Sequence, residues 1–312
     1  MVNQLLASAT EVDITPPIGT NLAGYVARKN RSIGIHDPLK AQVLLLKSND
    51  YQVVFITMDL LGIKIDFTNE VRMKINQAVG VPDDCILIAC SHTHSGPVVF
   101  LKSFAYIYNK QKLKLKQIIE DKILNAAILA SEKLRPARLG VGCINVEGIC
   151  CNRNNPDSGP VDNEVIVIRV DDEYNKPIAV VMNYGCHPTV LGYKNLLISA
   201  DFPGVVKATL NKIYPDTVFM YTNGASGDVS TRFTRREQTF NEAERLGNIL
   251  AGEVLRIMKN IITQKLVNIE SRIIPIKLKV RSLPSSEVAQ QELENFQIEL
   301  DKLKKIKHHQ VI

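Results

Sequence analysis

Two histidines separated by one residue follow a buried segment of the chain. The sequence Ser91-His92-Thr93-His94 comes directly after an apolar run at residues 85–90, which predicts a buried strand. If the backbone stays extended there, His92 and His94 project to the same face, because strand side chains alternate with a period of two. Neutral imidazole binds zinc through one ring nitrogen while the other donates a hydrogen bond, so the pair predicts half of a metal site. Taken alone, the pair fits equally well a polar loop with two partly exposed histidines.

Two more polar segments follow apolar runs. His187 comes after the run at residues 178–184, although a single histidine of this kind is more often a hydrogen-bonded core residue. Ser230 closes a Gly-rich segment at residues 223–230, whose glycines let the backbone turn sharply and approach a ligand. This segment is neither a serine-hydrolase elbow, because Asp228 takes the place of the last glycine, nor a phosphate loop, since no Gly-Lys-Ser/Thr follows. Taken alone it predicts a tight turn.

The positions of these polar segments in the chain indicate a shared site, which no single segment does alone. Each comes just after a predicted strand, and chemistry often gathers at strand ends in α/β folds, so we expect them to face one shared cleft. Arg153 lies in a turn-rich segment, where its guanidinium could bind a carbonyl or a carboxylate. A surface arginine with no such role is the alternative.

Seven short motifs are spread along the chain. In chain order they are TEVDITPP, GY, IHDPL, SHTHSGP, CNRN, YGCHPT and GDVS. Motifs in this order resemble the catalytic N-terminal part of the neutral/alkaline ceramidase family. No single motif establishes the resemblance, but the order of the motifs along the chain does. The resemblance runs over residues 7–259 and is closer to the uncharacterised bacterial branch of the family than to true ceramidases.

This resemblance implies a zinc-dependent hydrolase that cleaves a carboxamide (N-acyl) bond. The histidines that hold Zn²⁺ in the family match His92 and His187. His94 would lie beside the metal and orient the substrate or shuttle a proton. Arg153 matches an arginine that contacts the substrate, and Ser230 matches the active-site serine of the family. A water activated by the zinc ion would attack the amide carbonyl.

The sequence departs from the family pattern in two places. Thr231 stands where the family has a proline. The family also completes its metal shell with a glutamate and a tyrosine from a later part of the catalytic domain, and we find no such segment here. Glu253 is rejected as that ligand, because it lies inside a predicted helix. We therefore expect one α/β catalytic-type domain over residues 1–312 that is incomplete at its C-terminus. The alternative is a non-catalytic remnant with an incomplete metal shell, since catalytic zinc normally has three protein ligands.

Strands and helices alternate through most of the chain, which predicts an α/β fold with mixed β-sheets flanked by helices in a layered arrangement. A hairpin is expected at residues 41–60, turning at residues 48–50. The other expected strands are 85–90, 137–146, 164–170, 178–184, 217–222 and 267–280. Helices are expected at 66–79, 104–134 and 236–259, and from Ser286 nearly to the terminus.

The last expected helix carries an apolar stripe that needs a partner surface. Its members are Leu293, Phe296, Leu300 and Leu303. An oligomer contact or a further chain segment is expected to cover it.

The composition indicates the class of protein to which the chain belongs. A chain of 312 residues with 45% hydrophobic and 22% charged residues is globular, which excludes collagen, disordered tracts and disulfide miniproteins. No apolar run approaches the roughly 20 residues that cross a bilayer, so no transmembrane segment is expected. The first residues lack the features of a secretory signal, and we expect a cytoplasmic protein.

Charge and aromatic content restrict the classes of binding partner that the chain is expected to have. The formal charge is +6, but the chain has no Trp and only 6% aromatic residues, which disfavours nucleic acid as a partner. A small-molecule or lipid-like N-acyl substrate is the expected partner. An anion-binding module that uses the basic surface is the third alternative.

Overall fold

The computed structural model describes residues 4–49, 51–99, 110–279 and 282–309. The chain divides into two compact units, Met1–Arg272 and Ile273–Ile312. Each unit is described by itself. The single domain expected over residues 1–312 stays a prediction.

The first unit is built around one mixed sheet of eight strands in the order β11-β9-β8-β6-β1-β3-β4-β5. Neighbours run antiparallel except for β4 with β5 and β9 with β11, which are parallel. The strands are β1 (Leu5–Asp13), β3 (Lys40–Ser48), β4 (Tyr51–Met58), β5 (Ile86–Cys90), β6 (Arg135–Asn145), β8 (Glu164–Asp172), β9 (Pro177–Tyr184) and β11 (Val218–Asn223). Two short pairs lie outside it, β2 (Gly34–Ile35) with β10 (Leu197–Ile198) and β7 (Cys151–Asn152) with β12 (Val229–Ser230).

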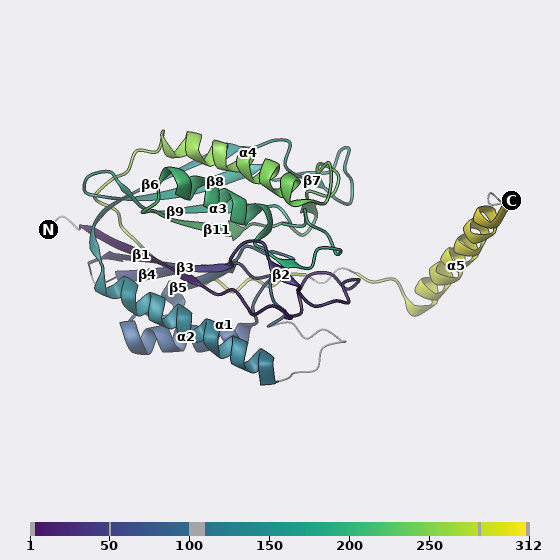
Figure 1. The fold of residues 1–312 in the computed structure, drawn as a ribbon, viewed down its shortest axis with the longest axis horizontal. Helices are drawn as coiled ribbons and strands as arrows, with labels where there is room; N and C mark the ends of the chain where they lie inside the picture. The colour runs from purple at the N-terminus through teal and green to yellow at the C-terminus, as the bar shows by residue number, and fades with distance from the viewer. Residues whose placement is uncertain (1–3, 50, 100–109, 280–281, 310–312) are drawn as a thin grey trace. The chain divides into compact units, whose positions relative to one another are not determined.

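Helices cover the two halves of this sheet from opposite sides (Figure 1). The half formed by β1, β3, β4 and β5 lies next to α1 (Ile65–Val79) and α2 (Lys110–Glu132), with the 3-10 turn η1 (Asp83–Cys85) leading into β5. The half formed by β8, β9 and β11 packs against α3 (Asp201–Ile213) and α4 (Phe240–Met258). The expected layered α/β arrangement of mixed sheet and helices is confirmed.

The two halves of the sheet also pack against each other. A third hydrophobic cluster joins residues from both halves, among them Leu44 and Leu46 of β3 and Val181 of β9. The alternate residues Val43 and Leu45 belong to the cluster below α1 and α2 instead. The first unit is therefore layered helix, sheet, sheet, helix. Strands buried on both faces explain why β3 is a continuous apolar run rather than an alternating one.

Most expected elements are found within one to four residues of their predicted bounds. Antiparallel β3 and β4 form the expected hairpin, and Asn49 turns the chain at φ 54, a conformation that asparagine tolerates. Gly80 ends α1 in a left-handed C-cap, and the Thr239 hydroxyl caps α4 by accepting from the amide of Glu242. Residues 104–109 of the helix expected at 104–134 lie outside the described part of the chain.

The strand expected at residues 267–280 is wrong for the residues that the structure describes. Val267 and Ile269 pack against the core between the sheet halves, but the described residues 267–279 form no strand pairing. The Val267 carbonyl accepts from the hydroxyl of Ser48 instead. From Ile273 onward the alternating apolar residues are exposed. An alternating pattern makes a strand only where a neighbouring strand pairs with it, and none does so here.

Two longer elements, β1 and α3, were not predicted, and neither were the short elements β2, η1, β7, β10 and β12. Strand β1 lies inside the sheet between β3 and β6, and only its residues 10–13 belong to a quoted motif, TEVDITPP. Helix α3 carries Phe202, Val206 and Leu210 on its buried face. Their spacing of four is the helical signal that could have revealed it.

The second unit contains the expected last helix, α5 (Ser286–His309). Leu293 and Phe296 of its stripe are 60% and 67% exposed, and the side chain of Leu303 lies outside the described set. The partner that covers this stripe stays a prediction. Within the described residues, no helix combines the length and apolarity needed to cross a membrane.

A buried ion pair joins the two halves of the first unit. The ammonium of Lys207 on α3 lies 2.7 Å and 2.6 Å from the two carboxylate oxygens of Asp59, which directly follows β4. The two side chains are 7% and 1% exposed. The backbone amide of Lys40 donates a further hydrogen bond to Asp59.

Removing one partner of this pair leaves the other charge buried and uncompensated. We expect Lys207→Met to lower the free energy of unfolding by about 3–5 kcal/mol, whereas Asp59→Leu/Lys207→Met should lose much less. Urea unfolding of both variants measures this. Equal losses in the single and the double variant would show that the pair is not the source of the effect.

The first residue of α3 is a buried aspartate in a left-handed conformation. Asp201 has φ 57 and is 2% exposed, and its carboxylate accepts from the amides of Phe202 and Leu191. Burial raises the pKa of Asp201 from 3.8 to about 6, with a smaller push from the Asp37 carboxylate, although the amides oppose the shift.

The folded chain therefore holds this proton more tightly than the unfolded chain. The resulting stabilisation is complete below pH 3.8 and is lost as pH rises through about 6. Since the amide of Asp201→Asn stays neutral, the wild type should lose up to about 3 kcal/mol relative to this variant between about pH 4 and pH 7.5. Urea unfolding at the two pH values tests this, with the exposed Asp216→Asn as control. A wild-type-to-variant difference that is the same at both pH values contradicts it.

Candidate functional site

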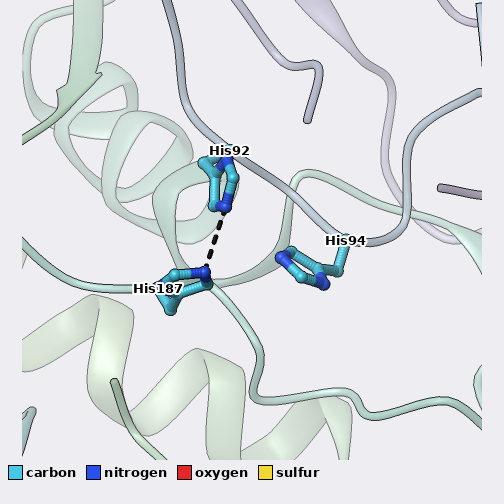
Figure 2. A group of neighbouring side chains, drawn as sticks. All are labelled: His92, His94 and His187. Atoms are coloured by element: carbon cyan, nitrogen blue, oxygen red, sulfur yellow. Dashed lines mark hydrogen bonds between the residues drawn. The ribbon is translucent and has the colours of Figure 1, made fainter. Parts of the chain in front are cut away.

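The imidazole rings of His92 and His187 face each other (Figure 2). His92 follows β5 and His187 follows β9, and their Nε2 atoms lie 3.1 Å apart. Each Nδ1 lies 2.6 Å from a backbone carbonyl, that of Leu61 for His92 and that of Ser226 for His187. A carbonyl only accepts, so each Nδ1 carries the hydrogen and each neutral ring turns an Nε2 lone pair toward the other. This is how metal-ligating histidines are held, with the second nitrogen donating to a backbone carbonyl.

His94 completes a cluster of three imidazoles. Its ring centre lies 5.1 Å from that of His92 and 5.5 Å from that of His187. One nitrogen from each ring falls within 4.8 Å of the others, so the three residues could hold a metal ion. Both ring nitrogens of His94 are buried, and neither has a hydrogen-bond partner of good geometry among the described residues. A buried polar group without a partner is costly, and such a group often marks a missing ligand.

The backbone brings His92 and His94 together by a route other than the expected one. Strand β5 ends at Cys90, and His92 adopts the left-handed conformation with φ 67 instead of continuing the strand. The amide of His92 donates to the carbonyl of Leu60. A left-handed residue other than glycine or asparagine is uncommon and is often found at functional sites.

The environment keeps all three imidazoles neutral at pH 7. Burial lowers the pKa values of His92 and His187, and the Arg153 cation lowers both further. Burial, and then the neighbouring His92 and His187, lower the pKa of His94 to about 3, while contact with the Gly24 backbone offsets a small part of the drop. Neutral imidazole is the form that binds a metal ion.

Arg153 lies at the exposed edge of this cluster. It follows β7, its amide donates to the Asp228 carbonyl at 2.6 Å, and its guanidinium donates to the Gly227 carbonyl. Gly227 directly follows Ser226, whose carbonyl accepts from His187, so the guanidinium binds the backbone next to that contact. The structure thus brings Arg153 to the cluster, and its role toward a substrate stays a prediction.

Ser230 lies beside the backbone of His187. It is 2% exposed, belongs to β12 and forms a bridge with His187, whose amide donates to the Val229 carbonyl. The Ser230 hydroxyl accepts from the amide of Arg232 at 3.2 Å. The neighbouring Thr231 hydroxyl is buried without a partner among the described residues. The catalytic role expected of Ser230 stays a prediction.

Sequence reasoning missed the groups that hold the histidines. The carbonyls of Leu61 and Ser226 carry no signal in the sequence, because every residue has a carbonyl. Gly24 belongs to the GY motif, which does not reveal that the Gly24 backbone lies against the ring of His94. Glu253 lies in α4, inside the helix expected there, and its carboxylate pairs with Arg256.

Comparisons with known proteins agree on the family. Residues 6–235 match the family described as neutral/alkaline non-lysosomal ceramidase, N-terminal. Neutral ceramidase A of Dictyostelium discoideum is 28% identical over 211 residues, which cover 62% of this chain and 30% of that protein. Neutral ceramidase of Oryza sativa subsp. japonica is 27% identical over 210 residues, covering 62% and 27%. This chain thus spans less than a third of these curated relatives.

Solved structures agree on the fold. The crystal structure of neutral ceramidase from Pseudomonas aeruginosa superposes with a TM-score of 0.67 at 21% identity, over 81% of this chain and 44% of that one. A structure titled ceramidase complexed with C2 gives a TM-score of 0.71 at 21% identity, with the same coverage.

The packing of Gly24 against His94 is testable with a matched pair of glycines. A Cβ on Gly24 would lie 2.3 Å from Nδ1 of His94, whereas a Cβ on Gly19 would meet nothing within 4 Å. Their φ angles are +94 and +88, so alanine suffers the same left-handed strain of about 1–2 kcal/mol at both. We expect Gly24→Ala to move the imidazole NMR signals of His94 and Gly19→Ala to leave them in place. Unchanged His94 signals in Gly24→Ala would contradict the close packing.

Proposed function

Because the chain belongs to the neutral/alkaline non-lysosomal ceramidase family, we propose that its histidine cluster is the zinc-binding part of a hydrolase site that cleaves an N-acyl carboxamide bond. The relatives are named neutral ceramidases, so ceramide is the first substrate to test. The observation that carries the proposal is the pair of Nε2 atoms of His92 and His187 facing each other at 3.1 Å.

The donor set fits Zn²⁺. Two imidazole nitrogens, each about 2.1 Å from one tetrahedral zinc ion, are about 3.4 Å apart, close to the observed separation. Two facing lone pairs repel each other, and a cation between them turns that repulsion into attraction. We assign the metal to His92 and His187. The orphaned nitrogens of His94 lie beside it.

The chain's own residues then have separate tasks. When bound, Zn²⁺ would polarise the amide carbonyl and lower the pKa of water toward 7. His94 stays neutral at every pH above about 3, so it suits a hydrogen-bond donor that orients the substrate oxygen better than a carrier of protons. Arg153 offers an exposed guanidinium to a carbonyl oxygen of the substrate. Ser230 is assigned to the substrate side of His187.

One observation favours a second candidate, a remnant that binds metal without turnover. The cluster of potential ligands around His92, His94 and His187 contains no carboxylate among the residues that the structure describes. In this case the chain would bind Zn²⁺ weakly and would not hydrolyse N-acyl substrates. The substrate class, the cytoplasmic location and any oligomer remain predictions.

Metal binding and turnover can be separated in one set of variants. We expect metal-free wild type to take up about one Zn²⁺ per chain by calorimetry, and His92→Ala and His187→Ala to weaken this affinity at least ten-fold. His36→Ala is the matched control, because His36 stacks on Phe240 outside the cluster. Hydrolysis of N-acylsphingosine should require zinc and both ligands.

The outcomes distinguish the two candidates. Zinc uptake without hydrolysis would favour the remnant. Equal zinc uptake by the wild type and both ligand variants would remove the metal site from this cluster.

A further inference from the structure

We propose that Arg28 is a positioning residue that fixes His94 relative to the loop following His187. The expected effect of Arg28 on catalysis rests on the proposed function. The contacts between Arg28 and the His94 loop do not depend on that function. Arg28 is 4% exposed and lies outside the seven motifs that resemble the family.

The guanidinium of Arg28 binds backbone carbonyls from three separate segments. Its Nη1 donates to the carbonyl of His94 at 2.7 Å and to that of Ala23 at 2.8 Å. Its Nη2 donates to the Gly192 carbonyl at 3.2 Å, and its Nε points to the Tyr193 carbonyl at 3.4 Å. One buried side chain thus joins the His94 loop, the segment before Gly24 and the loop that follows His187.

Tyr25 extends this contact to the imidazole itself. The Arg28 guanidinium lies over the Tyr25 ring at 4.9 Å, and the centre of that ring lies 5.0 Å from the centre of the His94 ring. The Tyr25 hydroxyl points to the Thr189 carbonyl at 3.4 Å, and Arg235 donates to the same carbonyl at 2.9 Å. Thr189 is two residues from His187, so the network connects the surroundings of both histidines.

The geometry of this network suits arginine and no other residue. Guanidinium is planar and holds five donors in a fixed fork, so one side chain serves several carbonyls at set angles. Lysine offers the same charge as a single point on a flexible stem. Because His94 has no hydrogen-bond partner of good geometry at its ring, its orientation depends on its backbone and on the groups packed around it.

The test compares Arg28→Met and Arg28→Lys with a matched arginine elsewhere. Arg138 on β6 also donates to a side-chain and a backbone oxygen, and both belong to Thr263, which is not a residue of the histidine cluster. The first readout is the set of imidazole ¹H–¹⁵N NMR signals of the metal-free protein. The second readout is Zn²⁺ affinity, and the third is the separate effect on kcat and KM for N-acylsphingosine.

We expect both Arg28 variants to shift or broaden the His94 signals and to leave those of His36 in place. If the metal site is as proposed, Zn²⁺ affinity or kcat should fall about ten-fold or more. Arg138→Met should lower Tm without either effect. If the wild type binds no zinc, the proposed function fails, while the His94 signals still decide the role of Arg28.

Two results would overturn the inference. One is a fall in Tm for Arg28→Met with His94 signals like those of the wild type, which would make Arg28 a merely stabilising residue. The other is a fully wild-type Arg28→Lys, which would show that charge alone suffices and that the fork does not position His94.

Discussion

The site depends on a sheet that folds back on itself. Strands β5 and β11 end the strand order at opposite edges, yet they contact each other, because the two halves of the sheet pack face to face through a shared core. Each half sends one histidine from the end of a strand, His92 after β5 and His187 after β9. Their Nε2 atoms can meet only while both halves keep this arrangement. The Asp59–Lys207 ion pair joins the same two halves close to the cluster, since Leu60 and Leu61, which hold His92, directly follow Asp59.

Several features of the site are unfavourable on their own, and the surrounding structure keeps them in place. His92 adopts a left-handed conformation, two unprotonated nitrogens face each other, and both nitrogens of His94 lack a good partner. Each of these features costs folding free energy, and strain of this kind persists only where the surroundings over-determine it. Here the carbonyls of Leu61 and Ser226 fix two rings, while Gly24 and Arg28 confine the third. These contacts hold a cluster that could bind a metal ion in one arrangement, and a bound metal would add to the stability of the chain by mass action.

The spacing of apolar residues predicted most helices and strands well, because a buried face of a helix or strand always repeats with the period of that element. The hairpin of β3 and β4 and the helices α1 and α4 followed from that rule. The strand expected at residues 267–280 failed for the same reason, since periodicity cannot show whether a partner strand exists. The site could be predicted only in part. His92, His94 and His187 were found because imidazole is chemically distinctive, whereas the carbonyls that orient them are present in every residue and become visible only in three dimensions.

The histidines of the cluster and any anionic ligand of a metal site can come from separate parts of a chain. The segment from Gly24 to Ser230 supplies the imidazoles, the carbonyls that set their tautomers and the arginines around them, and it lies inside the part that matches the family. A cation bound only by neutral imidazoles keeps its full positive charge, because none of these ligands is an anion. Such a cation attracts a carboxylate or another oxygen donor to its open side. Sheet packing and the backbone contacts therefore organise the histidines without any anionic ligand, and such a ligand would be a separate addition. A metal-binding remnant and a full hydrolase could share this one arrangement of histidines and differ only in the ligands that complete the metal shell.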